Sequence, residues 1–341
     1  MCRKLARILI SGFALLPPAV IASAANEAAL PVLIAGLKDH DWQVRRAAAR
    51  QLGEAARRDG QIVSALRTAL DDLDSRVRRS AATALGQIGS GAAGATPQLI
   101  KRLRDVDPEV VRSAAQALGL IGRRASRADR GLKPLLDDSD AEMRLTAADA
   151  LGRIGRDSAA SSAALVALLG NPEAQMRSAA ASALGRAGED AAETSAGLMK
   201  LLGDDDAQVR TAAAEALGKI GNSAVPQLIA SLNGGNPVYL QATVEALAQI
   251  GEPAVPALIE ALEDGRRPLL ARQHLARALG RIGNGKGKVV PALLRRLKDE
   301  NALVSGYLLL CPTFTMSRCF WSRYTVGAKL DVPNPTGRRA C

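Results

Sequence analysis

A sixteen-residue segment that recurs along the chain constrains the fold more than any other feature of the sequence. The segment Asp205–Ile220 reads D-D-A-Q-V-R-T-A-A-A-E-A-L-G-K-I and is followed by Gly221. Earlier copies occupy residues 74–89, 107–122 and 140–155. In each copy, apolar residues recur at helical spacing between an acidic N-cap position and a closing glycine. We therefore predict a helix in every copy.

The spacing of the copies predicts a second helix and a stacked architecture. Six copies follow one another at intervals of 33 residues, and their valine or methionine stands at Val44, Val77, Val110, Met143, Met176 and Val209. Upstream of each copy, leucines mark another helix, which proline often opens. Such Ala-rich helices cannot bury a core alone, because each buried leucine contributes only about 1.5–3 kcal/mol. We predict an all-α superhelix of about eight two-helix repeats and a broken ninth.

The repeated string D-x-x-V-R-x-x-A-A-x-A-L-G-x-I-G resembles the short HEAT-like repeats of the phycobilisome-lyase type, over roughly residues 28–304. The resemblance implies a HEAT/armadillo-like α-α superhelix whose second helices line a concave surface. It also implies that the arginine after the valine or methionine bridges to a turn acid of a neighbouring repeat. These arginines are Arg45, Arg78, Arg144, Arg177, Arg210 and Arg272.

Two repeats are expected to deviate from this pattern. Pro134 lies inside the first helix of repeat four, which we expect to be shortened or kinked. Repeat seven is three residues shorter than the others; in it Tyr239 takes the valine place, Leu247 the leucine place and Ile250 the isoleucine place.

The two ends of the chain depart from the repeats, which span residues 25–304. Residues 1–24 combine a basic start, an apolar run and Ala22-Ser23-Ala24, a pattern typical of a cleaved export signal. The alternatives for this segment are a capping helix or an uncleaved membrane anchor. We expect an exported protein, periplasmic or extracellular, without a stable membrane span after cleavage; a membrane-anchored or cytoplasmic protein is the alternative.

Residues 305–341 lack helical periodicity and hold Cys311, Cys319 and Cys341. We interpret this tail as a non-native or poorly ordered extension. A small disulfide-bearing appendage is the alternative, although three cysteines leave one unpaired.

The sequence shows no constellation for catalysis or metal binding. The only histidines are His40 and His274, and neither precedes a glutamate as in the iron-binding HEAT-like hydroxylases. Paired acids such as Asp72 and Asp74 recur in the turns, but no EF-hand glycine and distal glutamate follow them. Helix capping explains their spacing. We expect no catalytic residue, metal ion or cofactor.

The formal charge of +11 does not by itself indicate nucleic-acid binding. Arg3, Lys4 and Arg7 contribute part of it, and residues 302–341 contribute another part. The repeats are left with a mild positive balance, so nucleic acid is not our favoured partner.

The outer side of the second helix of each repeat is the candidate interaction face. Residues two and six positions after the valine or methionine point away from the core. The candidate partner-binding residues are Arg46, Arg50, Arg79, Thr83, Arg112, Gln116, Asp149 and Glu215. The early repeats are basic here and the later ones neutral or acidic. Pairs such as Asp149–Arg153 and Glu215–Lys219 would instead make this an ordinary solvated surface.

We interpret the chain as a non-enzymatic scaffold that binds a protein partner along this face, and the basic repeats favour a partner with an acidic segment. One alternative is an enzyme or enzyme accessory related to the phycobilin lyases. The other is a solenoid that binds nucleic acid.

Overall fold

The computed structural model describes residues 29–55, 60–155, 159–188 and 192–283, and every regular element in these ranges is a helix. The first helices of the repeats, called A, are α3 (Ala29–Gly36), α5 (Gly60–Ala69), α7 (Thr96–Arg102), α9 (Asp129–Leu132), α11 (Ala159–Leu168), α13 (Ala192–Leu201), α15 (Val225–Ser231) and α17 (Val255–Glu263). The second helices, called B, are α4 (Trp42–Glu54), α6 (Ser75–Ile88), α8 (Pro108–Ile121), α10 (Ala141–Ile154), α12 (Ala174–Ala187), α14 (Ala207–Ile220), α16 (Pro237–Ile250) and α18 (Leu269–Ile282). The predicted all-α repeat architecture is confirmed.

Three predictions concern residues outside the described ranges. They are the export signal in residues 1–24, the broken ninth repeat up to residue 304, and the irregular tail of residues 305–341. These stay predictions. Within the described residues, none of the helices has the length and apolar character needed to cross a bilayer.

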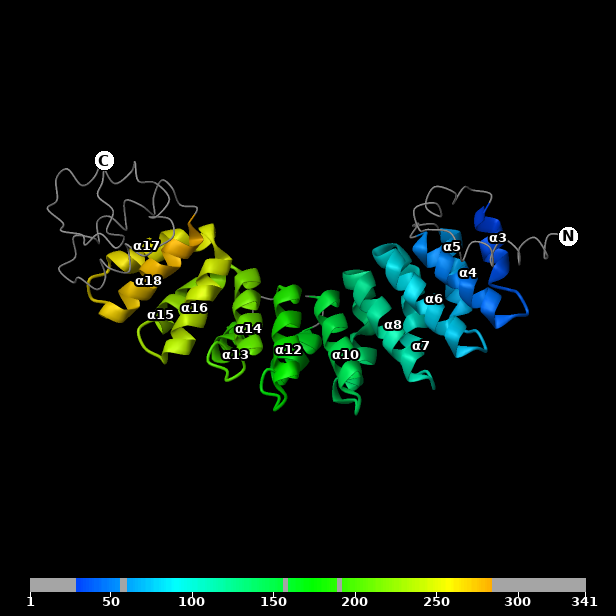
Figure 1. The fold of residues 1–341 in the computed structure, drawn as a ribbon, viewed down its shortest axis with the longest axis horizontal. Coiled ribbons are helices and arrows are strands. Elements are labelled where there is room, and N and C mark those ends of the chain that lie inside the picture. The colour runs from blue at the N-terminus through cyan, green and yellow to red at the C-terminus, as the bar shows by residue number, and fades with distance from the viewer. Residues whose placement is uncertain (1–28, 56–59, 156–158, 189–191, 284–341) are drawn as a thin grey trace, which may run out of the picture. The chain divides into compact units, whose positions relative to one another are not determined.

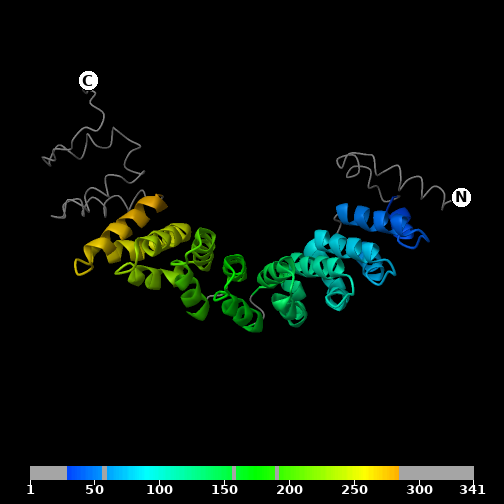
Figure 2. The ribbon, with the colours of Figure 1, turned by 60° about the horizontal axis from the view of Figure 1, so that its bottom comes forward.

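Internal packing divides the chain into two compact units, Met1–Ile220 and Gly221–Cys341. In the first unit, each B helix packs on the B helix of the next repeat, from α4 through to α14. The chain runs along this row without doubling back (Figures 1 and 2). In the second unit, α16 packs on α18. In both units the A helices pack on their own B helices, as α5 does on α6 and α17 on α18.

The ends of the B helices follow the predicted signals. Asp74 is the N-cap of α6, and its carboxylate accepts the Arg76 amide proton at 2.9 Å. The closing glycines adopt positive φ, as Gly89 does at 66° and Gly221 at 84°. Glu173 is an exception, because it occupies the N-cap of α12 without a side-chain capping bond. Its longer carboxylate instead accepts hydrogen bonds from Arg144.

The glycine of the A-L-G motif brings successive B helices of the first unit into close contact. A Cβ atom placed on Gly152 in α10 would lie 2.6 Å from the Cα atom of Ala183 in α12. Equivalent contacts join Gly53 to Ala84, Gly86 to Ala117, Gly119 to Ala150 and Gly185 to Ala216. Glycine is needed at these positions because a side chain would clash with the next B helix, not because the backbone has an unusual conformation there. The leucines before these glycines, including Leu85 and Leu151, are fully buried.

The two deviating repeats behave largely as their sequences indicate. Pro134 ends the α-helical part of the fourth A helix, since α9 gives way to the 3-10 helix η3 (Lys133–Asp137). In repeat seven, Leu247 and Ile250 are buried as predicted. Tyr239 is the third residue of α16, as Val209 is of α14, so it takes the valine place as predicted, but it is only half-buried. Leu240, which follows it at the arginine position of the other repeats, is buried.

Candidate interaction face

The arginines that follow the valine or methionine form a ladder of ion pairs between successive repeats of the first unit. Arg45 Nε lies 2.7 Å from Asp72 Oδ2, Arg78 Nη2 lies 2.7 Å from Asp105 Oδ1, and Arg177 Nε lies 2.7 Å from Asp204 Oδ2.

The same guanidinium groups also hold the turn of their own repeat. Arg78 Nη1 donates to the carbonyl oxygens of Asp72 at 2.9 Å and Leu73 at 3.1 Å. Meanwhile Asp105 Oδ1 accepts the amide proton of Asp107 at 3.1 Å. Each arginine therefore ties two turns together, and the internal ladder expected from the resemblance is present. We call these arginine–acid pairs the rungs.

Repeats three and four show how the ladder tolerates sequence changes. Val111, which is buried, replaces the arginine of repeat three, and Arg112 beside it pairs with Asp140 instead (Nη2–Oδ2, 2.6 Å). Arg112 also contacts Glu109 at 2.6 Å and Glu142 at 3.3 Å. The predicted partner-binding Arg112 is thus neutralised within the chain. In repeat four, Arg144 reaches Glu173 at 2.7 Å, because Asn171 replaces the usual turn aspartate.

The last two predicted rungs differ from the others. Arg210 Nη1 donates to the carbonyl oxygens of Asp204 at 2.7 Å and Asp205 at 2.8 Å. No carboxylate pairs with it among the ion pairs of the described residues, and the following turn has Gly234 at the position of the acid. For Arg272, the next turn lies beyond the described residues.

The turn acids are held ionised by these contacts. The pKa of Asp204 is lowered by the hydrogen bond from Arg177, against the opposing effect of burial. For Asp105, burial raises the pKa, but the Arg78 guanidinium and the Asp107 amide together lower it below its ordinary value. The pKa of Asp74 is lowered to about 2, chiefly by the hydrogen bond from Arg76.

This arrangement predicts an acid-sensitive fold. A carboxyl group whose pKa is lower in the folded state stabilises the fold above its unfolded pKa, and that contribution is lost as the pH falls toward the folded pKa. For Asp74 the window runs from its ordinary value of 3.8 down to about 2. We expect the thermal midpoint to fall across this window and the Asp74→Asn variant to show a shallower fall. Circular dichroism melts at successive pH values would measure it; identical pH profiles of the two proteins would contradict it.

The outward side chains of the B helices remain largely exposed. Arg46, Thr83, Gln116 and Glu215 are exposed, and the Arg79 side chain is 56% exposed. Arg50 is also 56% exposed and lies 3.4 Å from Glu54. Asp149 is tied to Arg153 and to Arg186, each at 2.7 Å. Of the two pairs that the alternative of an ordinary solvated surface would form, Asp149–Arg153 is present and Glu215–Lys219 is absent from the ion pairs of the described residues. The face is therefore basic in the first two repeats and has its acid Asp149 paired in repeat four. In repeat six it carries Glu215, for which the described residues show no ion pair.

A hollow lies on α4 at the basic end of this face. Its lining residues are Trp42, Gln43, Arg46, Ala47 and Arg50, and its volume is about 210 Å³. The indole ring of Trp42 is covered on one side by Arg76 of the next repeat, whose guanidinium carbon lies 3.2 Å from the ring centroid. Asp74 fixes Arg76 through two hydrogen bonds of 2.7 and 3.0 Å.

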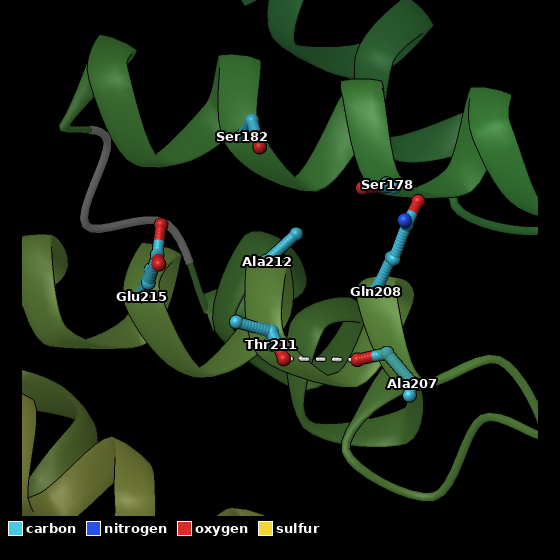
Figure 3. Close-up of a pocket in the computed structure, with 7 residues that line it drawn as sticks. All are labelled: Ser178, Ser182, Ala207, Gln208, Thr211, Ala212 and Glu215. Carbon is cyan, nitrogen blue, oxygen red and sulfur yellow. Dashed lines mark hydrogen bonds between the residues drawn. The ribbon is translucent and has the colours of Figure 1, made fainter.

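A second, polar hollow lies between α12 and α14 (Figure 3). Its volume is about 410 Å³, and Ser178, Ser182, Gln208, Thr211 and Glu215 contribute the polar groups. Gln208 extends toward Ser178, while the Thr211 hydroxyl donates to the Ala207 carbonyl oxygen at 2.9 Å (Figure 3). This hollow carries an acid but no base.

The described residues were also searched for a group of side chains that could bind a metal ion. Among the residues that the structure describes, no cluster of histidine, cysteine, aspartate and glutamate has the arrangement to hold a metal ion. In the turn that holds Asp72 and Asp74, the first aspartate accepts the rung from Arg45 and the second caps helix B. The capping interpretation of the paired acids is therefore confirmed.

Sequence reasoning missed two features that depend on neighbouring repeats. One is the stack of Asp74, Arg76 and Trp42, although Trp42 is the only tryptophan in the repeat region and so was a visible anomaly. The other is the glycine contact between B helices, whose signal was the recurrence of glycine within the helix rather than at its end.

Stacked helical pairs, short turns and a repeated rung define the chain as an α-solenoid. The family profile described as HEAT repeats matches residues 30–119, 96–185, 162–233 and 225–306. The chain belongs to the HEAT-repeat family.

Comparison with solved structures gives the same fold. A crystal structure of an engineered protein aligns with a TM-score of 0.51 and 25% identity, covering 90% of this chain and 92% of the other. The complex of CpcE and CpcF of phycocyanin lyase from Nostoc aligns with a TM-score of 0.43 and 26% identity, covering 67% and 92%. At that TM-score we draw nothing about activity from the likeness. A search of curated proteins found no match.

Proposed function

We propose that the chain is a non-enzymatic scaffold that binds a protein partner along the outer side of the B helices in its first unit. The observation that carries the proposal is the division of the arginines into two sets. Arg45, Arg78 and Arg177 are committed to rungs and are 10–18% exposed. Arg46 and Arg79 directly follow rung arginines and Arg50 lies one turn beyond Arg46; all three are exposed.

The outward arginines contribute little to the fold. Arg79 is 3.6 Å from Glu109, both groups being well exposed, and Arg50 has only the exposed contact with Glu54. Exposed pairs of this kind are worth about 0–1 kcal/mol. Arg46 has no ion-pair partner within the described residues. Charges kept at the surface without a structural role are available to an acidic partner, and solenoids commonly bind partners along an extended helix face.

Charge reversal on this face tests the proposal. The full-length chain and the triple variant Arg46→Glu, Arg50→Glu, Arg79→Glu would be used as baits in an extract of the host cell. We expect a defined partner, identified by mass spectrometry, to be lost at least about tenfold from the variant, because like charges would then oppose an acidic segment.

The matched control places three reversals away from this face, in or just after the A helices of repeats one to three. Lys38, Arg67 and Arg104 are exposed and have no ion pair within the described residues. Their reversal to glutamate should leave capture unchanged, and melting curves of both variants should match the parent chain. Equal capture by the parent and by the Arg46/Arg50/Arg79 variant would remove the proposal.

A further inference from the structure

Three side chains that line the hollow on α4 are regularly spaced, and their spacing matches that of an extended peptide. Trp42, Arg46 and Arg50 lie four residues apart on one helix and all line the hollow. A helix rises about 1.5 Å per residue, so these three side chains stand at steps of about 6 Å. In an extended peptide, residues two apart share a face at steps of about 6.6 Å. The two spacings match over three positions.

The chemistry of the three positions differs from one end to the other. Trp42 presents an aromatic ring, one face of which is already occupied by Arg76. Arg46 and Arg50 present guanidinium groups, which pair with carboxylates in a bidentate manner. Arg46 has no competing acid within the described residues, and Arg50 has only Glu54 at 3.4 Å.

The hollow is too small for a cofactor, but it has room for one apolar side chain and the carboxylates beside it. Its volume is about 210 Å³, whereas pockets for small-molecule ligands usually measure about 300–1,000 Å³. An apolar side chain against Trp42, with carboxylates reaching the two arginines, would fill it.

We infer that this hollow is the anchor site for an extended acidic segment of a protein partner, with an apolar residue followed at two-residue intervals by two acids, in the pattern Φ-x-E-x-E. The segment lies along α4 with its apolar side chain against Trp42 and its carboxylates on Arg46 and Arg50. This inference rests on the proposed scaffold function and names the chemistry of its partner. The polar hollow at Ser178 and Glu215 lacks any cation, so the same segment has no anchor there.

Tryptophan fluorescence can test the inference directly. The chain has two tryptophans, so Trp321→Phe leaves Trp42 as the only reporter. We would titrate this full-length variant at low ionic strength, where surface charges are less screened. The probes are blocked peptides with the core F-S-E-S-E and with the rearranged core F-S-S-E-E, in otherwise identical glycine–serine flanks. Adjacent acids on a strand point to opposite faces, so only the first peptide can reach both arginines.

The expected result is a saturable change in Trp42 emission, with the F-S-E-S-E peptide binding at least about fivefold more tightly than its rearranged partner. Arg46→Gln and Arg50→Gln should each weaken binding by roughly tenfold, since each removes a charge-assisted contact. Arg67→Gln, which is exposed on α5 and lies outside both the hollow and the proposed partner-binding face, is the matched control and should change affinity less than about twofold.

Three outcomes would overturn the inference. They are equal affinity for the two peptides, insensitivity to Arg46→Gln, and tighter binding of an oligothymidine of equal charge than of the peptide. The last result would identify a general polyanion surface rather than a peptide anchor. A photo-crosslinking residue at Gln116, away from the hollow, distinguishes failure of the anchor site from failure of the proposed scaffold function. If it captures a protein partner while the peptides fail, the anchor is wrong and the scaffold stands; if neither binds, the scaffold itself fails.

Discussion

Replacing Asp105 by alanine is expected to destabilise the chain by about 3 kcal/mol. The Asp105 side chain is 3% exposed and accepts hydrogen bonds from Arg78 at 2.7 and 2.9 Å. Removing one partner of a buried ion pair typically costs about 3–5 kcal/mol, because the other charge stays buried without compensation. Arg78 keeps its bonds to two carbonyl oxygens, which places the expected value at the lower end.

Chemical denaturation measures this change, and hydrogen exchange of α6 and α8 would locate it. The matched control is Glu54→Ala, which removes an exposed pair with Arg50 and should cost no more than about 1 kcal/mol. A second control replaces both partners, as Arg78→Met with Asp105→Leu, and should cost less than Asp105→Ala alone. If Asp105→Ala and Glu54→Ala have the same small effect, the rung does not hold the repeats together.

Replacing Gly152 by valine is expected to destabilise the first unit by about 3 kcal/mol or more. A Cβ atom on Gly152 would lie 2.6 Å from the Cα atom of Ala183 and 2.7 Å from its carbonyl oxygen. These are backbone atoms, so α10 and α12 must separate to make room. Overpacking a close contact usually costs about 1–3 kcal/mol, and the branched valine adds two further methyl groups.

The control for this substitution is Gly60→Ala at the start of α5. A Cβ atom at Gly60 meets no atom within 4 Å, and alanine loses less backbone entropy than glycine in a helix. It should therefore be neutral or stabilise the chain by up to about 1 kcal/mol. Denaturation midpoints of the two variants, compared with the parent chain, should move in opposite directions. Tolerance of valine at Gly152 would show that the close packing of α10 on α12 does not require glycine at this position.

The sequence was sufficient to predict the local elements because their causes are local. N-cap aspartates, closing glycines and the interruption at Pro134 each act within one turn of helix, and the structure confirms them. The ladder could be anticipated from the resemblance, since arginine and acid recur in register.

The environment of individual charges could not be read in the same way, because it depends on residues about 27 positions away in the next repeat. Arg112 looked like an outward arginine, yet the buried Val111 beside it leaves Arg112 as the group that meets Asp140. Glu173 looked like a cap, but its extra methylene lets it meet Arg144 instead. The stack of Arg76 on Trp42 likewise joins two repeats. The division of the chain after Ile220 had only an indirect signal, the glycine-rich turn at residues 233–237.

The central claim is that the arginines of the B helices have separate roles, with Arg45 and Arg78 holding the repeats together and Arg46 and Arg50 binding the partner. The most direct test measures unfolding free energy and F-S-E-S-E peptide affinity on the same preparations of Asp105→Ala and Arg46→Gln. The account predicts that Asp105→Ala lowers stability by about 3 kcal/mol and, below its melting range, keeps the parent affinity, whereas Arg46→Gln keeps the parent stability and loses about tenfold in affinity. The account would be contradicted if Arg46→Gln destabilised the chain as much as Asp105→Ala and left peptide binding unchanged.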